Sequence, residues 1–374
     1  DGKHMKKVIL YTSGQITHTR QTGGVRRFLE LLNRLPKYVE LTFMSGDTLC
    51  LLPTGVRHIS MNQKKIYDKE WKCAIHNFQY LNKIRKEHYD TIIVFDIPPA
   101  IWLTLFRIPR MTLMIRKDFI GYEKIRFSET DKNSLKKAIA LKIFSLAEVR
   151  TILHAQKIIV QCKYDREELK KRHKFFGNII DKKTKVQINN VNPSWAVSFE
   201  NEKKNNLEER FSVGSVNDFT SKRKGCDIFL KAIAELIDEG IPLQGYIAGD
   251  GKLFNYYKEK YSTYKQIYFL GRIKNPSEFV KKMDLAVVPS RADSCPNTIM
   301  EALYNEVPVI GSRCGGIPEI LKDSRALFDP DIQELKDRIL FFMEDKNRNE
   351  LLNRQKNRKE ELCFDWVKKI ADLL

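Results

Sequence analysis

Short apolar segments alternate with helical segments along this chain, and the alternation occurs twice. In the first half the strand-like segments are residues 8–12, 41–44, 91–95, 111–115 and 157–161, and the helical ones are residues 25–35, 71–87 and 134–153. Buried strands separated by helices favour a parallel sheet with helices on both faces. The first half is therefore predicted to fold as a doubly wound α/β domain.

The alternation restarts after a polar, charged segment at residues 200–210. The strands expected there are residues 210–216, 244–248, 266–270, 284–289 and 307–311, and the helices are residues 225–239 and 297–304. A chain of 374 residues fits two such domains. We predict an N-terminal domain at residues 5–195 and a second domain from residue 196. The ligand of such a pair is expected between them, at the carboxyl ends of the strands.

The composition excludes several other classes of protein. With 42% apolar residues, 21 Phe and 14 Tyr, the chain can bury real cores, so wholesale disorder is excluded. No window reaches the roughly 18 uninterrupted apolar residues that a membrane-spanning helix needs. Residues 91–115 come nearest, and charges and prolines interrupt them. Seven cysteines without a C-x-x-C pair favour a reducing cytoplasm over a disulfide framework or a structural zinc site.

We expect no signal peptide at the N-terminus. Residues 1–4 precede Met5, and we expect them to be an addition to the native start. The apolar run at residues 8–11 is too short for the core of a signal peptide and is better explained as a first strand. A cytoplasmic location is therefore expected.

The positive charge of the chain is concentrated in its first half. The whole chain has a formal net charge of +19, and residues 1–195 hold 37 Lys and Arg against 18 Asp and Glu. The remaining residues hold 29 of each kind and are neutral. A cationic half is typical of a protein that binds nucleic acid, an anionic membrane surface or a phosphorylated substrate, and solubility alone is the other explanation.

Residues 289–321 carry the densest set of chemically informative residues. Asn297 and Glu301 are four positions apart and share one face of an expected helix, and Asp293 lies in the loop before it. Glycines 315–316 follow the next strand. The free N–H groups of a helix N-terminus bind phosphate, and carboxylates accept hydrogen bonds from sugar hydroxyls. The segment therefore predicts a site for a nucleotide-sugar, which presents a phosphate and a polyol together.

This segment resembles the nucleotide-sugar half of glycosyltransferase family 4, whose members are retaining enzymes of GT-B architecture. The family carries an acidic residue, seven intervening residues and a Glu. Here these positions are Asp293 and Glu301, with Asp where Glu is commoner. The resemblance implies that Asp293 contacts the hydroxyls of the donor sugar and that Glu301 binds the ribose. It also implies donor contacts from Ser294, Cys295, Pro296, Asn297 and Thr298.

A second similarity lies between Gly214 and Gly225, which match the family's strand, phosphate loop and helix. The family commonly has an Arg directly after the first glycine and a Lys directly before the second. Ser215 occupies the Arg position here, and Lys224 occupies the Lys position. The resemblance implies that Lys224 binds the diphosphate and that Arg223 replaces the missing Arg. A solvated basic loop is the alternative interpretation.

Further similarities complete the predicted site. Gly23 and Gly24 resemble the family's glycine loop after the first strand, where the backbone approaches a phosphate closely. Gly251 and Arg272 resemble the turns around the base. Residues 364–366 resemble the start of the last helix, which implies a donor domain at 196–361 and a helix at 362–374 that returns to the first domain. Candidates for the acceptor side, without an assigned role, are His18, Arg116 and Asp118.

The resemblance implies a retaining transfer of a sugar from a UDP- or GDP-sugar to a hydroxyl of a glycan or lipid-linked acceptor, in cell-surface polysaccharide or glycolipid biosynthesis. The nucleotide leaves as a diphosphate anion, and stabilising that charge is the main catalytic task. Lys224 and Arg223 are expected to supply positive charge, so no metal is expected. The nucleotide-sugar is a co-substrate, and no side chain is assigned as nucleophile or general base.

In GT-B architecture the N-terminal domain binds the acceptor, which would give its positive charge a use. With a lipid-linked acceptor, this domain would lie on the inner face of the cell membrane, where each nearby cation contributes roughly 1 kcal/mol of attraction to anionic lipid. Cations gather at residues 64–86 and 163–174, and solvated helix faces are the alternative. Residues 134–150 are expected to make a poor membrane helix, because their lysines do not gather on one side.

Three alternatives stay open. A nucleic-acid-binding protein would explain the basic charge, but no recognisable module is present, and no nucleic-acid partner is expected. A sugar-nucleotide epimerase can share the GT-B architecture and would act without an acceptor. A glycosyltransferase-like binding protein without activity is the third, because Ser215 and Asp293 depart from the family pattern.

Overall fold

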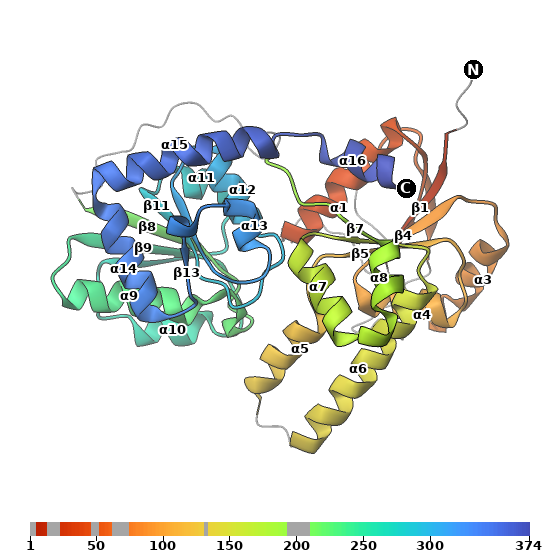
Figure 1. The fold of residues 1–374 in the computed structure, drawn as a ribbon, viewed down its shortest axis with the longest axis horizontal. Helices are drawn as coiled ribbons and strands as arrows, with labels where there is room; N and C mark the ends of the chain where they lie inside the picture. Colours follow the sequence, from red (N-terminus) through yellow and green to blue (C-terminus); the bar gives the residue numbers. More distant parts are fainter. Residues whose placement is uncertain (1–4, 13–22, 46–51, 62–74, 131–133, 193–209) are drawn as a thin grey trace. The chain divides into compact units, whose positions relative to one another are not determined.

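A computed structural model of the chain describes residues 5–12, 23–45, 52–61, 75–130, 134–192 and 210–374 (Figure 1). The chain forms two compact units. The first unit comprises Asp1–Ile120, Lys132–Ile188 and Asp365–Leu374, and the second comprises Gly121–Asp131 and Asn189–Phe364. The domain limits expected at residues 195 and 361 stay predictions.

Seven parallel strands form the sheet of the first unit, in the order β3-β2-β1-β4-β5-β6-β7. The strands are β1 (Lys7–Tyr11), β2 (Glu40–Ser45), β3 (Arg57–Ser60), β4 (Thr91–Phe95), β5 (Met111–Ile115), β6 (Lys157–Val160) and β7 (Thr184–Val186). The two central strands β4 and β5 are buried at every residue, as expected for a parallel sheet covered on both faces. From β1 the chain adds β2 and β3 on one side, and from β4 onward it adds strands on the other side. The neighbouring strands β1 and β4 therefore mark the switch point, where ligands of doubly wound sheets bind.

Helices cover both faces of this sheet. Helix α1 (Gly23–Arg34) contacts the C-terminal helix α16 (Trp366–Leu373), with the Arg27 guanidinium 5.2 Å from the centre of the Trp366 ring. Arg34 and Tyr38 donate hydrogen bonds to the Asp365 carboxylate at 2.8 and 2.9 Å, which fixes the start of α16 in this unit. An apolar cluster joins the sheet to α3 (Phe78–Lys86), α4 (Ile97–Leu105), α6 (Ser134–His154), α7 (Lys163–Arg172) and α8 (Gly177–Lys183).

Six parallel strands form the sheet of the second unit, in the order β10-β9-β8-β11-β12-β13. The strands are β8 (Phe211–Val216), β9 (Leu243–Ala248), β10 (Ile267–Gly271), β11 (Leu285–Val288), β12 (Val309–Ser312) and β13 (Leu327–Phe328). The order again reverses once, between β8 and β11. Two doubly wound parallel sheets confirm the predicted α/β architecture.

The helices of the second unit follow from amphipathic sequence and from caps. Phe229, Ile233 and Leu236 of α9 are fully buried, and each such side chain stabilises the fold by roughly 1.5–3 kcal/mol. The Asp331 carboxylate accepts hydrogen bonds from two backbone N–H groups at the start of α14. The helices are α9 (Cys226–Asp238), α10 (Phe254–Lys260), α11 (Pro276–Lys281), α12 (Asn297–Tyr304), α13 (Ile317–Leu321), α14 (Ile332–Met343) and α15 (Asp345–Leu362).

Several elements were not expected from the sequence. Strands β3, β7 and β13 lie at the edges of the sheets and are too short for their sequences to predict them. Helix α4 follows β4 directly, and Pro98 and Pro99 lie in its first turn, where a missing N–H costs no intrahelical hydrogen bond. Two of the three prolines that interrupt residues 91–115 therefore begin a helix. None of the described helices is long and apolar enough to cross a bilayer.

Candidate functional site

The loops that follow β8 and β11 meet at the switch point of the second sheet. These neighbouring strands are parallel, with Val213 opposite Leu285, so their carboxyl ends lie together. The loop after β8 ends in a short 3-10 helix, η4 (Lys222–Lys224), and the loop after β11 carries Asp293. The ammonium of Lys224 binds the carboxylate of Asp293 directly. The structure thus joins the predicted phosphate-binding cation to the predicted sugar-binding acid.

Gly225 allows the two loops to approach each other. Its φ of 73° is left-handed, and a Cβ at this position would lie 1.9 Å from the carbonyl oxygen of Pro289. Two further links hold the loops: the Arg291 N–H donates to the carbonyl of Arg223 at 2.7 Å, and the Arg291 guanidinium binds the Asp227 carboxylate at 2.7 and 2.9 Å. The position of Lys224 is therefore fixed by backbone contacts on both sides.

Arg223 is held by three groups of the second unit. Its guanidinium donates to the Asp218 carboxylate and to the carbonyl of Ala292, each at 3.0 Å, and lies 4.3 Å from the centre of the Tyr122 ring. Burial acts to lower the pKa of Arg223, but Tyr122, Asp293 and Asp218 oppose it and the net pKa is raised. Arg223 is therefore a fixed positive charge next to Lys224 in the same short helix.

The Asp218 carboxylate is the anchor of this arginine. Burial acts to raise its pKa, but hydrogen bonds from Thr220 and the charge of Arg223 outweigh burial, and the pKa lies below its usual range. Asp218 therefore stays ionised at neutral pH and holds Arg223 in place. It has a positioning role that the sequence pattern did not reveal.

The glycine pair after β12 fixes the backbone of Asp293. The Gly316 N–H donates to the Asp293 carbonyl at 3.0 Å. Gly315 has a φ of 52°, and a Cβ there would lie 2.0 Å from the same carbonyl oxygen. The neighbouring Cys314 thiol donates to the carbonyl of Ser290 at 2.9 Å, and burial raises its pKa to about 11, so the thiol stays protonated.

Helix α12 and the loop before it carry six of the predicted donor residues. Glu301 is 2% exposed, and the loop residues Ser294, Cys295 and Pro296 are buried. Asn297 and Thr298 are half-buried in the first turn of the helix. The Asn189 side chain donates to the Cys295 carbonyl at 3.4 Å and to the Asn297 side-chain oxygen at 3.3 Å. Asn189 thereby orients the helix start.

Other predicted donor residues have different surroundings. The Ser215 side chain, at the end of β8, is buried and accepts a hydrogen bond from Asn217 at 3.3 Å. It therefore helps to hold the start of the loop that follows β8. Gly251 has a φ of 146°, and a Cβ there would lie 2.4 Å from the Phe219 carbonyl carbon. Arg272 is exposed after β10, which β9 separates from β8. Arg272 thus follows the outer strand of the sheet and not the switch point.

Comparison with known proteins finds a family that part of the second unit matches. Residues 210–345 match the family described as glycosyl transferases group 1, and they contain Lys224, Asp293 and Glu301. The matched residues lie within the second unit. Over 238 residues the chain is 26% identical to an uncharacterized glycosyltransferase of Methanocaldococcus jannaschii, with 61% of this chain and 54% of that protein covered. The chain thus spans about half the length of this relative.

Solved structures share the fold over nearly the whole chain. HepE of Anabaena, in complex with UDP and glucose, is 17% identical with a TM-score of 0.69 and 99% of each chain covered. WaaG, a glycosyltransferase involved in lipopolysaccharide biosynthesis, is 14% identical with a TM-score of 0.70 and 98% of each chain covered. These likenesses show the fold, which is the GT-B class of two Rossmann-like domains.

The first unit has a charged cluster of its own at the switch point of its sheet. Gly23 and Gly24 open α1, and the Gly24 carbonyl accepts a hydrogen bond from the Arg116 guanidinium at 3.2 Å. Asp96 follows β4 at the switch point and accepts hydrogen bonds from both the backbone N–H and the guanidinium of Arg116, at 2.9 and 2.7 Å. Arg116 is thereby held at the glycine turn.

Asp118, a second acceptor-side candidate, does not join this cluster. The Asp118 carboxylate accepts a hydrogen bond from Arg172 at 2.6 Å, and Arg172 also contacts the buried Glu148 at 3.3 Å. Asp118 therefore belongs to an ion-pair network of the first unit. His18 lies outside the described residues.

Sequence reasoning missed Asp96, which a simple signal could have found. It is an acid directly after a buried central strand, and that is the place where doubly wound sheets present functional side chains. Its φ of 64° and ψ of 165° place it in a strained backbone region that is almost confined to glycine, and such strain clusters at functional sites. Tyr122 and Asp218 had no such signal, because their contacts with Arg223 depend on tertiary packing.

We expect Asp96→Asn to lower the free energy of unfolding by about 1 kcal/mol and Asp96→Ala by about 2–4 kcal/mol. Asn keeps an acceptor for the Arg116 N–H, whereas Ala leaves both the N–H and the guanidinium of Arg116 without their Asp96 acceptors. Urea denaturation of the full chain measures the difference. The exposed Asp90 is the control, since Asp90→Asn should stay within about 0.5 kcal/mol. Equal losses for the two Asp96 variants would show that the side-chain acceptor for Arg116 does not matter there.

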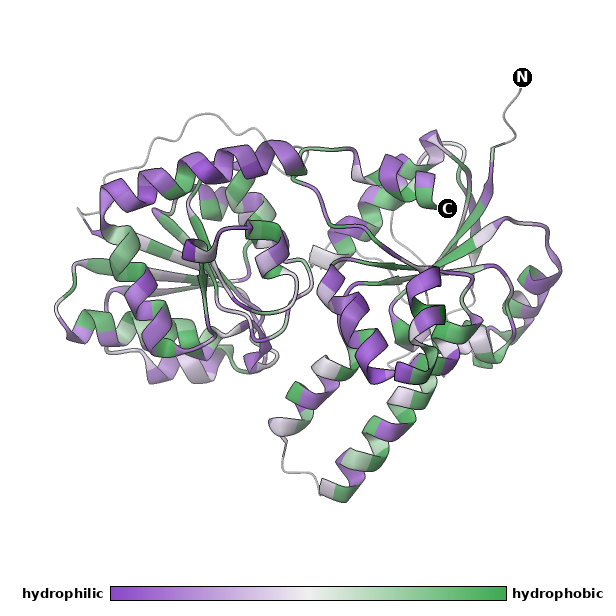
Figure 2. Ribbon diagram, in the orientation of Figure 1, coloured by the Kyte–Doolittle hydropathy of each residue, from purple (hydrophilic) through white to green (hydrophobic). Residues whose placement is uncertain are grey.

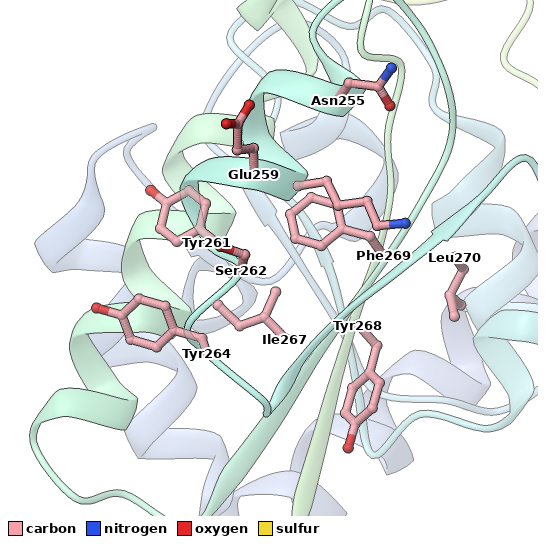
Figure 3. A pocket seen from close by; sticks show the side chains of 10 residues that line it. Asn255, Glu259, Tyr261, Ser262, Tyr264, Ile267, Tyr268, Phe269 and Leu270 are labelled. Carbon is pink, nitrogen blue, oxygen red and sulfur yellow. The ribbon is translucent and has the colours of Figure 1, made fainter.

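A hollow of about 560 Å³ lies between α10 and β10 (Figure 3). Its wall includes Tyr261, Tyr264 and Tyr268, and none of the predicted donor residues lines it. It therefore lies at the outer edge of the sheet, apart from the switch point. Within the described part of the chain, no group of three or more His, Cys, Asp or Glu side chains could hold a metal ion. Metal-independent transfer stays a prediction.

Proposed function

We propose that this protein transfers a sugar from a nucleotide-sugar to a hydroxyl acceptor. The observation that carries the proposal is the pairing of Lys224 with Asp293 at the switch point of a group 1 glycosyltransferase domain. The Lys224 ammonium suits a diphosphate, and the carboxylates of Asp293 and Glu301 suit the hydroxyls of a sugar and a ribose. The fold neighbour HepE holds UDP and glucose, which supports a UDP-sugar as the donor, with a GDP-sugar as the alternative.

The proposed chemistry rests on fixed positive charge. As the nucleoside diphosphate leaves, negative charge grows on its phosphates, and donors that are already in place stabilise it without reorganising. Lys224 and Arg223 are such groups, because backbone contacts hold the first and Asp218 holds the second. We propose transfer without a metal ion and with retention of the anomeric configuration, as the resemblance to family 4 implies.

The proposed acceptor is a glycan or a lipid-linked glycan bound by the first unit. The support is the excess of positive charge in residues 1–195 and the position of Arg116 at the switch point of that sheet. The neighbour WaaG is involved in lipopolysaccharide biosynthesis, which supports a role in cell-surface polysaccharide or glycolipid assembly. We propose that the protein works in the cytoplasm, on the inner face of the cell membrane, and without nucleic acid.

A thermal-shift panel of nucleotide-sugars tests the donor site. UDP-glucose, UDP-galactose, UDP-N-acetylglucosamine and GDP-mannose are compared, and the donor at about 100 times its Kd should stabilise the fold by ~2.7 kcal/mol, or roughly 5–10 °C. Glu301→Gln should abolish the response, because the buried carboxylate is the proposed ribose ligand.

Glu306→Gln is the matched control, since Glu306 lies five positions further on, is exposed and pairs with Lys359 at 3.0 Å. A full response in the Glu301 variant would contradict the ribose assignment. If the responding nucleotide-sugar is converted to an epimer with no acceptor present, the protein is an epimerase and the transferase proposal fails.

A further inference from the structure

Helix α6 exposes a stripe of large apolar side chains. Helix α6 packs against α4, and Thr151 and Ile152 on its inner side are buried, with Ile152 in the apolar cluster of the first unit. The opposite side exposes five residues, called here the α6 stripe: Leu135 (65%), Ile139 (51%), Ile143 (57%), Leu146 (67%) and Leu153 (36%). Spacings of four, four, three and seven place them on one helix face. Figure 2 shows hydrophobic residues along the whole of α6.

The exposed surface of α6 is cationic as well as apolar. Lys136, Lys142 and Arg150 are exposed on the helix. Its single acidic residue, Glu148, is buried, with His173 at 2.8 Å and Arg172 at 3.3 Å. Among the helix residues, the solvent therefore meets apolar and positive side chains but no carboxylate.

We propose that the α6 stripe docks the protein on an anionic lipid surface, in support of the proposed transfer to a lipid-linked acceptor. Leucine and isoleucine side chains enter the boundary between headgroups and acyl chains, while the long lysine and arginine side chains keep their charges among the headgroups. The helix lies on the surface and does not span it, in agreement with the absence of spanning helices in the described chain.

Charge decides between this partner and a second copy of the chain. A symmetric dimer through the α6 stripe would bring the same cations of two copies against one another, and no exposed carboxylate on the helix would offset them. Anionic lipid offers the opposite charge and a continuous apolar layer. The positions of the lysines alone predict a poor membrane helix at residues 134–150. Packing against α4 and α8 decides which side of α6 is free.

Co-sedimentation of the full chain with phosphatidylcholine vesicles, with and without phosphatidylglycerol, tests the proposal. The parent should bind the anionic vesicles, and the triple variant Ile139→Ser, Ile143→Ser, Leu146→Ser should bind at least about tenfold more weakly. Lys136→Gln, Lys142→Gln, Arg150→Gln should remove the preference for phosphatidylglycerol. Tyr256→Ser is the control, because this exposed side chain lies on α10 in the second unit and should leave binding unchanged.

Any of three results would overturn the proposal: no binding of the parent to anionic vesicles, parent-like vesicle binding by the triple serine variant, or a dimer of the parent in solution that this variant abolishes. Thermal melting checks that each variant folds. The donor panel is run on the same variants, and an unchanged response separates the two proposals, because Lys224, Asp293 and Glu301 lie in the second unit. A failure of vesicle binding with intact donor response removes the docking surface alone.

Discussion

Lys224→Ala is expected to lower kcat for sugar transfer about 100- to 1000-fold, which is the usual cost of removing one preorganised donor from a developing anion. Lys224 lies at the switch point between β8 and β11, where its ammonium donates a hydrogen bond to the Asp293 carboxylate. On this proposal it meets the leaving diphosphate, and its charge is needed more in the transition state than in the ground state. The release of nucleoside diphosphate from the donor found by the thermal-shift panel measures the loss.

The same short helix supplies a matched control. Lys222 belongs to η4 with Lys224 but has an exposed side chain, and its structural contacts run through its backbone, which accepts from Arg291 at 2.7 Å. Lys222→Ala should therefore keep activity within about twofold, as expected for an exposed charge. If both variants lose activity equally, the loop works through its total charge. If a folded Lys224→Ala variant keeps more than a tenth of the parent's kcat, Lys224 is not the diphosphate cation.

The positions of these loops could be predicted from the sequence because each part of the signal is local. Apolar runs mark β8 and β11, glycines mark the tight turns, and parallel strands bring their carboxyl ends together. The pairing of Lys224 with Asp293 follows from that topology. Glu301 was predicted from the seven residues that separate it from Asp293, the spacing of the family it resembles.

Other parts of the site depend on packing that a local pattern does not encode. Asp218 and Tyr122 hold Arg223, yet nothing in their sequence neighbourhood marks them for that contact. Asp118 was a candidate for the acceptor side, and a contact with Arg172, 54 positions away, ties it into the fold. The free face of α6 likewise depends on which side packs against α4 and α8.

Gly225→Ala is expected to have the largest effect on stability, about 2–5 kcal/mol lost from the free energy of unfolding. The left-handed φ of 73° costs a Cβ-bearing residue about 1–2 kcal/mol, and the overlap with the Pro289 carbonyl adds about 1–3 kcal/mol, because a backbone atom cannot rotate away. The displaced η4 would also move Lys224 from Asp293. A misplacement near 1 Å costs about 100-fold in rate, so transfer should fall by at least that factor.

Gly240 separates the two causes, because it has a φ of 78° but a Cβ at this position would meet no atom within 4 Å. Gly240→Ala should lose only the roughly 1–2 kcal/mol of backbone strain and keep full activity, since it lies after α9, away from the switch point. Urea denaturation gives both free energies, and diphosphate release gives both rates. Equal destabilisation of the two variants would mean that the chain absorbs the overlap at Pro289. The contact between the β8 and β11 loops would then not be what holds Lys224 in position.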